Sequence, residues 1–207
     1  MENNFSITIG RQYGSGGREI GELLAERLGM TFYDKELLVE AVKESGLEPE
    51  IFEQFDEKPT NSFFYSLLMG IRAGKIQPNQ YDLALPEQVH QIGFDVIRKL
   101  AEEKSCIFIG RCADYALRAH PNCLKLFIYA PLDSRMERIQ KRRNVDAQEA
   151  ADLIRQTDKQ RAAYYNYYSN QKWGAIGSYQ LCIDSSLCGV EGTVDLLEQL
   201  VQKRKRA

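Results

Sequence analysis

Short apolar runs and longer stretches of helical spacing alternate along most of the chain. Four runs predict buried strands, and a shorter fifth run follows the first helical stretch; they cover residues 5–9, 106–109, 124–129, 179–183 and 31–33. The second and third of these runs do not alternate strictly between apolar and polar residues, as is typical of strands buried on both faces. Helical patterns lie between the runs, so the sequence predicts an α/β fold: a five-stranded parallel sheet with helices on both faces.

Two long stretches show helical spacing and no convincing strand. The first, residues 34–104, reads as helices interrupted at prolines and at a GKIQPNQ turn, with its last helix beginning near Pro86. In a parallel-sheet protein this is a natural place for a helical insertion over the substrate, and we assign the insertion to residues 45–103. The second stretch, residues 133–169, is also helical and is rich in arginine and tyrosine.

Length and charge narrow the class of protein. A chain of 207 residues fits one domain, which we expect to span residues 1–207. The formal net charge of −2 gives no reason to expect a nucleic-acid polymer as partner. No apolar run approaches the roughly 20 residues of a membrane span, and Met1 leads directly into the first predicted strand, leaving no room for a signal peptide. We therefore expect a cytoplasmic protein with no membrane partner; the oligomeric state is not predicted.

The cysteines and histidines argue against a metal site in the protein. The chain has five cysteines and two histidines, His90 and His120, which stand alone, and no C-x-x-C pair occurs. The odd number of cysteines argues against a full disulfide framework. Cys106 and Cys182 fall in apolar strand-like runs, where we expect small buried residues. No residue is therefore assigned as a metal ligand.

A glycine-rich turn lies between the first predicted strand and the first helix. It reads Gly14-Ser15-Gly16-Gly17. Such a turn exposes backbone N–H groups at a helix N-terminus, where the helix dipole also attracts anions. Glycine reaches dihedrals that are costly for other residues and lets a phosphate approach the backbone closely. The turn predicts a phosphate-binding loop; the alternative is a turn that only packs the helix on the strand.

The string R-x-Y-G-S-G-G-R-E-I, residues 11–20, resembles the signature of the cytidylate kinase-like family, which consists of divergent nucleoside monophosphate kinase-like P-loop proteins. Aligned without gaps on the usual phosphate loop of cytidylate kinases, Arg11 falls on the first glycine and Gly17 on the lysine. Glu19 falls on the threonine. The loop thus resembles a nucleotide-binding loop that lacks its lysine.

The resemblance continues over most of the chain outside residues 45–100. In LGMTFYDKELL, Asp34 matches the Asp that begins the monophosphate-binding region. In IFIGRCADY, Arg111 matches the arginine of a G-R-D turn, but Cys112 replaces the Asp that contacts the base. Arg135 and Arg138 match a pair of arginines on the following helix. DKQRAAYYNYY resembles the lid segment of the family, and we assign the lid to residues 133–172.

The resemblance implies phosphoryl transfer from ATP, with Mg²⁺, to a nucleoside monophosphate such as CMP or to a similar small phosphate acceptor. Small nucleotides would then be the partners. Two alternatives stay open. A nucleotide-binding regulatory protein that kept the fold and lost catalysis is supported by Gly17 in place of lysine. A kinase of another small metabolite is supported by Cys112 and by the insertion, which carries no recognisable motif.

Phosphoryl transfer needs positive charge around the transferred group, and arginines are the candidates. Arg18 is the nearest substitute for the lysine, because its guanidinium suits phosphate oxygens; the alternative is pairing with an acidic neighbour on the helix. Arg161 is our candidate for a cation that acts in the transition state. The implied nucleotide-binding residues are the loop and the paired arginines: Gly14, Ser15, Gly16, Gly17, Arg18, Arg135 and Arg138.

Two residues are assigned to the acceptor. Arg111 follows a predicted strand at its carboxyl end, where ligands of open parallel sheets gather, and can grip a monophosphate bidentately. Asp34 either contacts the ribose or base or caps the next helix, and the two roles are compatible.

Two further features leave alternatives open. Glu19 either is stabilised by the helix dipole or contacts Mg²⁺. The aromatic cluster at 164–173 either stacks a base or packs the lid against the body.

Overall fold

The computed structural model describes residues 4–34 and 80–206. Its centre is a five-stranded sheet in the order β2-β3-β1-β4-β5, and every pair of neighbouring strands is parallel. The α/β fold with a parallel sheet is therefore confirmed. The strands are β1 (Ser6–Arg11), β2 (Thr31–Tyr33), β3 (Cys106–Ile109), β4 (Cys123–Tyr129) and β5 (Leu181–Asp184).

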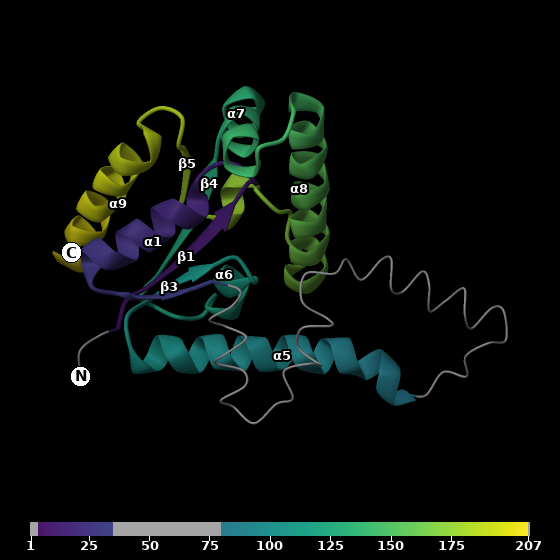
Figure 1. Cartoon of the computed structure of the whole chain (residues 1–207). Coiled ribbons are helices and arrows are strands. Elements are labelled where there is room, and N and C mark those ends of the chain that lie inside the picture. Colours follow the sequence, from purple (N-terminus) through teal and green to yellow (C-terminus); the bar gives the residue numbers. More distant parts are fainter. Residues whose placement is uncertain (1–3, 35–79, 207) are drawn as a thin grey trace, which may run out of the picture.

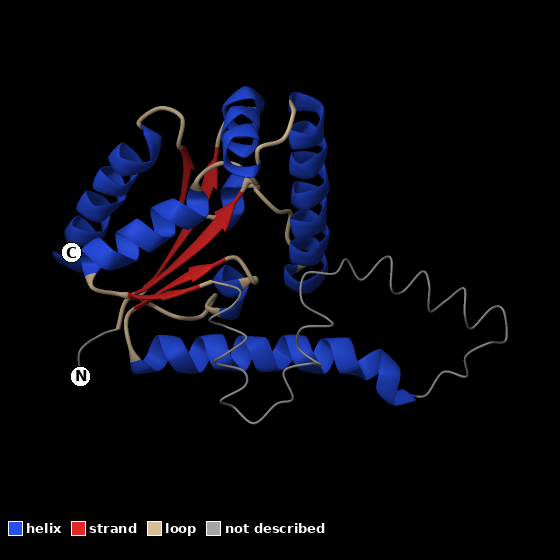
Figure 2. Ribbon diagram, viewed as in Figure 1, coloured by secondary structure: helices blue, strands red, loops and turns tan. Residues whose placement is uncertain are grey.

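Helices cover both faces of the sheet (Figure 1 and Figure 2). The helical elements are α1 (Gly17–Leu28), α5 (Gln80–Glu103), α6 (Ala113–Ala116), α7 (Leu132–Arg143), α8 (Ala147–Ser169), the 3₁₀ turn η1 (Ile176–Ser178) and α9 (Gly189–Arg206). On one face, α1 and α9 pack over β1 and β4 through residues such as Leu24 and Leu197. On the other face, α5 and α6 pack over β3, with Phe94, Ile97 and Ala113 buried.

The ends of the elements differ from the sequence expectation at two places. The last helix before β3 begins at Gln80, not near Pro86; a proline removes one backbone hydrogen bond and can bend a helix without ending it. The last strand begins at Leu181 rather than at residue 179. Tyr179 instead follows the 3₁₀ turn and is buried against Phe127, so its apolar character marks the core and not a ladder position.

β1 also runs further than its apolar pattern suggests. It extends to Arg11, which pairs with Ile128 of β4, and the N–H of Gln12 still donates to the Ile128 carbonyl at 3.0 Å. The loop that follows β1 therefore starts from a fixed strand.

Two further expectations concern the cysteines and the insertion. All five cysteines are free, and Cys106 is fully buried in β3, while Cys182 in β5 is partly buried. Of the expected insertion at 45–103, the part before Gln80 lies outside the described residues, and the rest forms α5. The helices expected over 133–169 are confirmed as α7 and α8.

Candidate active site

The glycine turn after β1 adopts a conformation that requires glycine. Gly14 has φ of 83° and Gly16 has φ of 78°, both in the left-handed region. A Cβ on Gly14 would lie 2.9 Å from the Arg135 carbonyl oxygen, so space excludes a side chain there as well. Gly16 caps α1, which begins at Gly17. The turn thus presents its backbone at the N-terminus of an α-helix, the geometry that favours anions.

Ser15 holds the turn from inside. Its hydroxyl donates to the Gln12 carbonyl at 2.9 Å, and the Gly17 N–H reaches the same hydroxyl oxygen at 3.4 Å. The Ser15 carbonyl accepts a hydrogen bond from the Ser185 hydroxyl at 2.6 Å, just after β5. Ser15 is buried, and its side chain therefore holds the shape of the loop.

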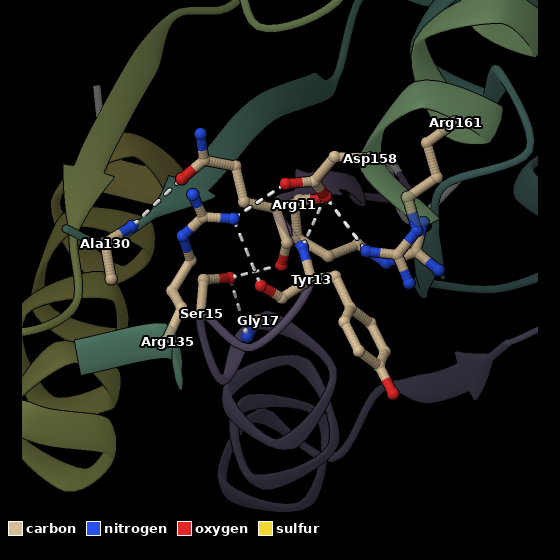
Figure 3. A network of polar contacts seen from close by, with 9 residues as sticks. Arg11, Tyr13, Ser15, Gly17, Ala130, Arg135, Asp158 and Arg161 are labelled. Carbon is tan, nitrogen blue, oxygen red and sulfur yellow. Dashed lines mark hydrogen bonds and ion pairs between the residues drawn. The ribbon is translucent and has the colours of Figure 1, made fainter. Parts of the chain in front are cut away.

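The turn is also tied to the lid helices by a buried ion pair. Arg135 of α7 and Asp158 of α8 approach to 2.7 Å, with side chains 10% and 17% exposed. Asp158 accepts a hydrogen bond from the Tyr13 N–H at 2.7 Å, and Arg135 donates to the Tyr13 carbonyl at 3.3 Å (Figure 3). The pair therefore grips both sides of one loop residue, which gives Arg135 a positioning role.

A cleft lies between the glycine turn and α7. Its free volume is about 110 Å³. Arg138 of α7 forms an ion pair with Glu19 of α1 across it, and the Arg138 guanidinium carbon lies 3.3 Å from where a Cβ on Gly16 would sit. Arg142 lines the same cleft. Several positive charges thus face the helix N-terminus.

Arg18 lies on the rim of this cleft, engaged with carboxylates. Its guanidinium is 2.6 Å from Asp34 and 2.9 Å from Glu22, one turn further along α1. The Arg18 side chain is 49% exposed, whereas that of Asp34 is 8% exposed. The pairing with an acidic neighbour, which the sequence left open for Arg18, is therefore present, and Asp34 is brought to the same place.

Arg161 reaches toward the loop from α8. One guanidinium nitrogen donates to the Arg11 carbonyl at 3.1 Å (Figure 3). The guanidinium carbon also lies 5.6 Å from the centroid of the Tyr13 ring, a distance typical of a cation–π contact. The side chain is thus held at the junction of loop and lid.

A second pocket opens at the carboxyl ends of β1 and β3. Its free volume is about 30 Å³, and Arg111 lines it from the turn after β3. Gly110, Arg111 and Cys112 have φ of 74°, 58° and 52°, three left-handed residues in succession. Left-handed residues other than glycine carry strain that clusters at functional sites. Arg111 is 8% exposed, and this burial lowers the pKa of its guanidinium.

Asp114 lies in the same pocket and escaped the sequence analysis. Its carboxylate accepts a hydrogen bond from the Tyr165 hydroxyl at 2.6 Å, and burial raises its pKa, opposed by that hydrogen bond. The family resemblance predicts a carboxylate at position 112, but this position holds the buried Cys112. The left-handed turn followed by the start of α6 brings a carboxylate from two residues later into the pocket.

The aromatic cluster of α8 divides between pocket and core. Tyr165 belongs to the buried core, with Tyr164, Tyr168 and Trp173 packed against it. Tyr164, Tyr165 and Trp173 also line the second pocket. Packing of the lid helix against the body is therefore observed. Stacking on a base stays a prediction.

The two pockets meet at a pair of arginines. Arg11 and Arg161 line both the cleft at the glycine turn and the pocket around Arg111. A group bound in one pocket would therefore face a group bound in the other across these two guanidinium groups. Arg11 had no role in the sequence analysis, since it replaces a loop glycine and lies beyond the predicted strand, which ended at residue 9; β1 in fact extends to Arg11.

The described part of the chain shows neither a cluster of metal-ligating side chains nor a helix that could span a membrane. Within residues 4–34 and 80–206, no group of three or more His, Cys, Asp or Glu side chains is placed to hold a metal ion. Among the helices described, none combines the length and apolar character needed to cross a membrane.

Comparisons with known proteins agree with this geometry. A family model described as cytidylate kinase-like matches residues 6–187. The cytidylate kinase of Methanopyrus kandleri is 25% identical over 204 residues, covering 94% of this chain and 92% of that protein. The cytidylate kinase of Methanocaldococcus jannaschii is 24% identical, covering 97% and 99%.

Two solved structures share the fold. An uncharacterized protein from Eubacterium ventriosum has a TM-score of 0.73 at 27% identity, covering 96% of this chain and 99% of that one. A shikimate kinase from Bacteroides thetaiotaomicron has a TM-score of 0.53 at 16% identity, covering 96% and 98%. The second match supports the P-loop kinase fold alone.

Proposed function

Because the chain belongs to the cytidylate kinase-like family, we propose that it transfers the γ-phosphoryl group of ATP to a nucleoside monophosphate, with CMP as the first acceptor to test. The archaeal relatives named as cytidylate kinases support this choice over nearly their whole length. The donor binds at the glycine turn and the acceptor in the pocket around Arg111.

The observation that carries the proposal is the meeting of the two pockets at Arg11 and Arg161. A kinase of this kind must bring two phosphate groups together, although their negative charges repel. Arginines shared by both pockets place positive charge where the two phosphates meet, and positioning with charge stabilisation accounts for nearly all the catalysis in phosphoryl transfer.

The chemical step balances without a covalent enzyme intermediate. An oxygen of the acceptor phosphate forms a bond to the γ-phosphorus of ATP. The bond between that phosphorus and the oxygen bridging it to the β-phosphate breaks, and ADP leaves with the electron pair. ATP and a nucleoside monophosphate thus give ADP and a nucleoside diphosphate, with no general base required when the acceptor phosphate is ionised.

ATP enters as its Mg²⁺ complex, in which the metal neutralises part of the phosphate charge. Carboxylate oxygens are ligands that Mg²⁺ accepts. Among the described residues that line the cleft, Glu19 supplies the carboxylate, and in this structure Arg138 holds it beside the turn. The residues present therefore fit an Mg²⁺–nucleotide complex whose metal is held chiefly by the phosphates.

Each acceptor residue has a role that follows from its surroundings. Arg111, buried and held by a strained turn, grips the monophosphate; a charged hydrogen bond is strong in such a low-dielectric place. Asp34 lies near enough to act on Arg111 electrostatically, and it restrains Arg18. Asp114, with Tyr165, can accept from the exocyclic amine of cytosine, a pairing that carboxylates make. On this proposal, Asp114 makes the contact with the base that Cys112, which has no carboxylate, cannot make.

We retain the predicted division of the chain as part of this proposal. Residues 133–172 act as the lid, and the hydrogen bond from the Tyr13 N–H to Asp158, within the Arg135–Asp158 ion pair, links its position to the loop. The insertion at 45–103 shapes the acceptor pocket, and α5 forms its described portion.

Two observations favour two other functions. Gly17 stands where the usual loop has a lysine, which supports a nucleotide-binding regulatory protein without catalysis. A kinase acting on a different small metabolite is supported by Cys112 in the acceptor turn.

A single panel assay separates these functions. ADP release is measured with ATP, with and without Mg²⁺, against the common nucleoside monophosphates and against non-phosphorylated acceptors such as small hydroxy acids and sugars. The proposal expects Mg²⁺-dependent turnover that is fastest with CMP. Turnover with a hydroxyl acceptor alone would select the other-metabolite kinase. Tight ATP binding with no turnover on any acceptor would select the regulatory protein.

A further inference from the structure

Position 17 cannot carry a side chain while Arg11 is present. Gly17 is the first residue of α1 and is buried. A Cβ built on it would lie 2.6 Å from the Arg11 Cβ and 3.2 Å from the Arg11 Cγ. Carbon atoms do not approach so closely, and the Arg11 Cβ cannot turn away because it is bonded directly to a backbone held in the sheet. The lysine of the usual loop is therefore excluded by the stem of an arginine.

The backbone fixes where this arginine starts. Arg11 is the last residue of β1 and pairs with Ile128 of β4, and its carbonyl accepts a hydrogen bond from Arg161. The usual loop has a glycine here. In this chain the strand continues through the position, so a long side chain is carried on a rigid element instead of a flexible one.

The side chain of Arg11 extends from the glycine turn, where its Cβ lies, to the acceptor pocket, where its guanidinium lies. A Cβ built on Gly110 would lie 2.1 Å from Arg11 Nη1, so the guanidinium rests against the turn that precedes Arg111. Near its stem Arg11 lines the donor cleft together with Gly14, Gly16 and Gly17, and it also lines the pocket of Arg111. Its charge lies along the path between donor and acceptor.

We propose that Arg11 is the catalytic cation that replaces the lysine of the phosphate loop, binding the terminal phosphates of the donor and stabilising the charge on the transferred group. The identity of the ligand rests on the proposed function above. The cation thus comes from the strand before the loop and crosses the space that Gly17 leaves open. Arg18, the nearer candidate in sequence, is held at the rim by Asp34 and Glu22 and does not occupy that path.

Substitution of Arg11 tests the role directly. Arg11→Met keeps the stem and removes the charge. We expect the single-turnover rate at saturating ATP to fall by about 100-fold or more, as on loss of an electrostatic group that acts in the transition state, and ATP affinity to fall about tenfold. Arg11→Lys recovers part of the rate, since it keeps a charge but has a shorter reach. Arg118→Met, exposed in the turn after α6 and outside both pockets, is the matched control and leaves both values unchanged.

An exchange of the two positions gives the sharper test. Arg11→Gly with Gly17→Lys rebuilds a conventional loop, because removal of the Arg11 Cβ opens the space for the lysine stem; Ile128, at 3.2 Å from the new Cβ, must shift slightly. We expect the double variant to be at least tenfold faster than Arg11→Gly alone. Arg11→Ala with Gly17→Lys keeps the obstructing Cβ and should show no such recovery.

The outcomes separate this inference from the proposed function. The wild-type protein must turn over, and a thermal melt must show that the Arg11→Met variant is folded. If the turnover number of this variant is then within about threefold of the wild-type value, the proposed role of Arg11 is overturned, while the kinase function stands. No recovery in a folded exchange variant would overturn the equivalence of the two positions. A wild-type protein that transfers nothing would overturn the kinase; ATP affinity then decides on Arg11, since unchanged affinity in Arg11→Met rejects its phosphate contact.

Discussion

Arg111 illustrates how a single side chain is prepared by its backbone. Three successive left-handed residues turn the chain back after β3 and direct the guanidinium into a buried pocket. The strain of such a turn costs on the order of 1–3 kcal/mol for each residue other than glycine, and it is maintained by the packing of α6 and β3. A buried cation of this kind stabilises a bound anion more than an exposed one does.

Removal of the Arg111 charge should therefore affect the acceptor alone. Arg111→Ala is expected to weaken monophosphate binding by about 1.5–3 kcal/mol, the usual contribution of a charged hydrogen bond, with ATP affinity nearly unchanged. Isothermal titration with each nucleotide measures the two values. An equal loss for both ligands would mean that Arg111 supports the donor site or the fold.

Arg161 should act mainly on the rate. We expect Arg161→Ala to lower turnover by on the order of 10²-fold or more, in line with arginines that act on the transition state in other phosphoryl-transfer enzymes, while donor affinity changes only a few-fold. Because Arg161 also holds the Arg11 carbonyl, Arg161→Gln serves as a second variant that keeps a hydrogen-bond donor. A rise in the Michaelis constant for ATP with an unchanged turnover number would contradict the assignment.

At the scale of elements, α7, α8 and the glycine turn form one connected unit. The pair of Arg135 and Asp158 joins the two helices and holds both backbone groups of Tyr13. A small apolar cluster of Ile139, Ala150 and Ile154 also joins the helices, and Tyr13 packs against it. The position of the loop is therefore tied to that of α7 and α8 through polar and apolar contacts.

Breaking this pair should destabilise the protein strongly. Asp158→Ala leaves the buried Arg135 without its carboxylate partner and the Tyr13 N–H without an acceptor, and loss of one partner of a buried pair costs about 3–5 kcal/mol. Asp152→Ala, which breaks the exposed pair with Arg155 one turn apart, should change stability by less than about 0.5 kcal/mol. Urea unfolding of both variants measures the difference, and similar losses would disprove a special role for the buried pair.

The strands and the site were predictable to different degrees. Runs such as Cys106–Ile109 read directly as strands because burial on both faces leaves few polar positions. The glycine turn followed from the residue pattern, the place of Arg111 followed from the end of a predicted strand together with the resemblance, and the choice of Arg161 rested on the lid segment that the resemblance gave. Asp114 and Arg11 could not be predicted, because neither stands at the sequence position of the family residue that it replaces. The left-handed turn before α6 places the Asp114 carboxylate in the pocket, and the extension of β1 places Arg11 at the end of a strand. Such replacements depend on where side chains meet in space, which spacing along the chain does not contain.

For the whole molecule, an aromatic contact joins α5 to α8, two helices that are far apart in the sequence. His90 of α5 stacks on Tyr168 with ring centroids 3.5 Å apart, and its Nδ1 lies 3.0 Å from the Tyr164 hydroxyl. Burial lowers the pKa of His90 to about 3. The ring is therefore neutral in the folded protein at neutral pH and becomes charged more easily when the chain unfolds.

This histidine should make the protein sensitive to acid. Since its folded pKa is depressed from the usual 6.5, its contribution to stability is complete above pH 6.5 and is lost as the pH falls toward 3. Between pH 6.5 and pH 4 the loss is on the order of 3 kcal/mol. His90→Phe keeps an aromatic ring and removes the titration, so its unfolding free energy should fall less over this range. Urea unfolding at several pH values tests this, and parallel curves for the two proteins would contradict it.

The crowding of Arg11 against Gly17 also has an evolutionary consequence. A lineage that carries this loop cannot gain the lysine first, because the new Cβ would collide with the stem of Arg11. It cannot shed the arginine first without passing through an ancestor that has neither cation in the loop. On the proposed role of Arg11, a change from one form of loop to the other by single substitutions therefore passes through a protein that lacks both of these cations.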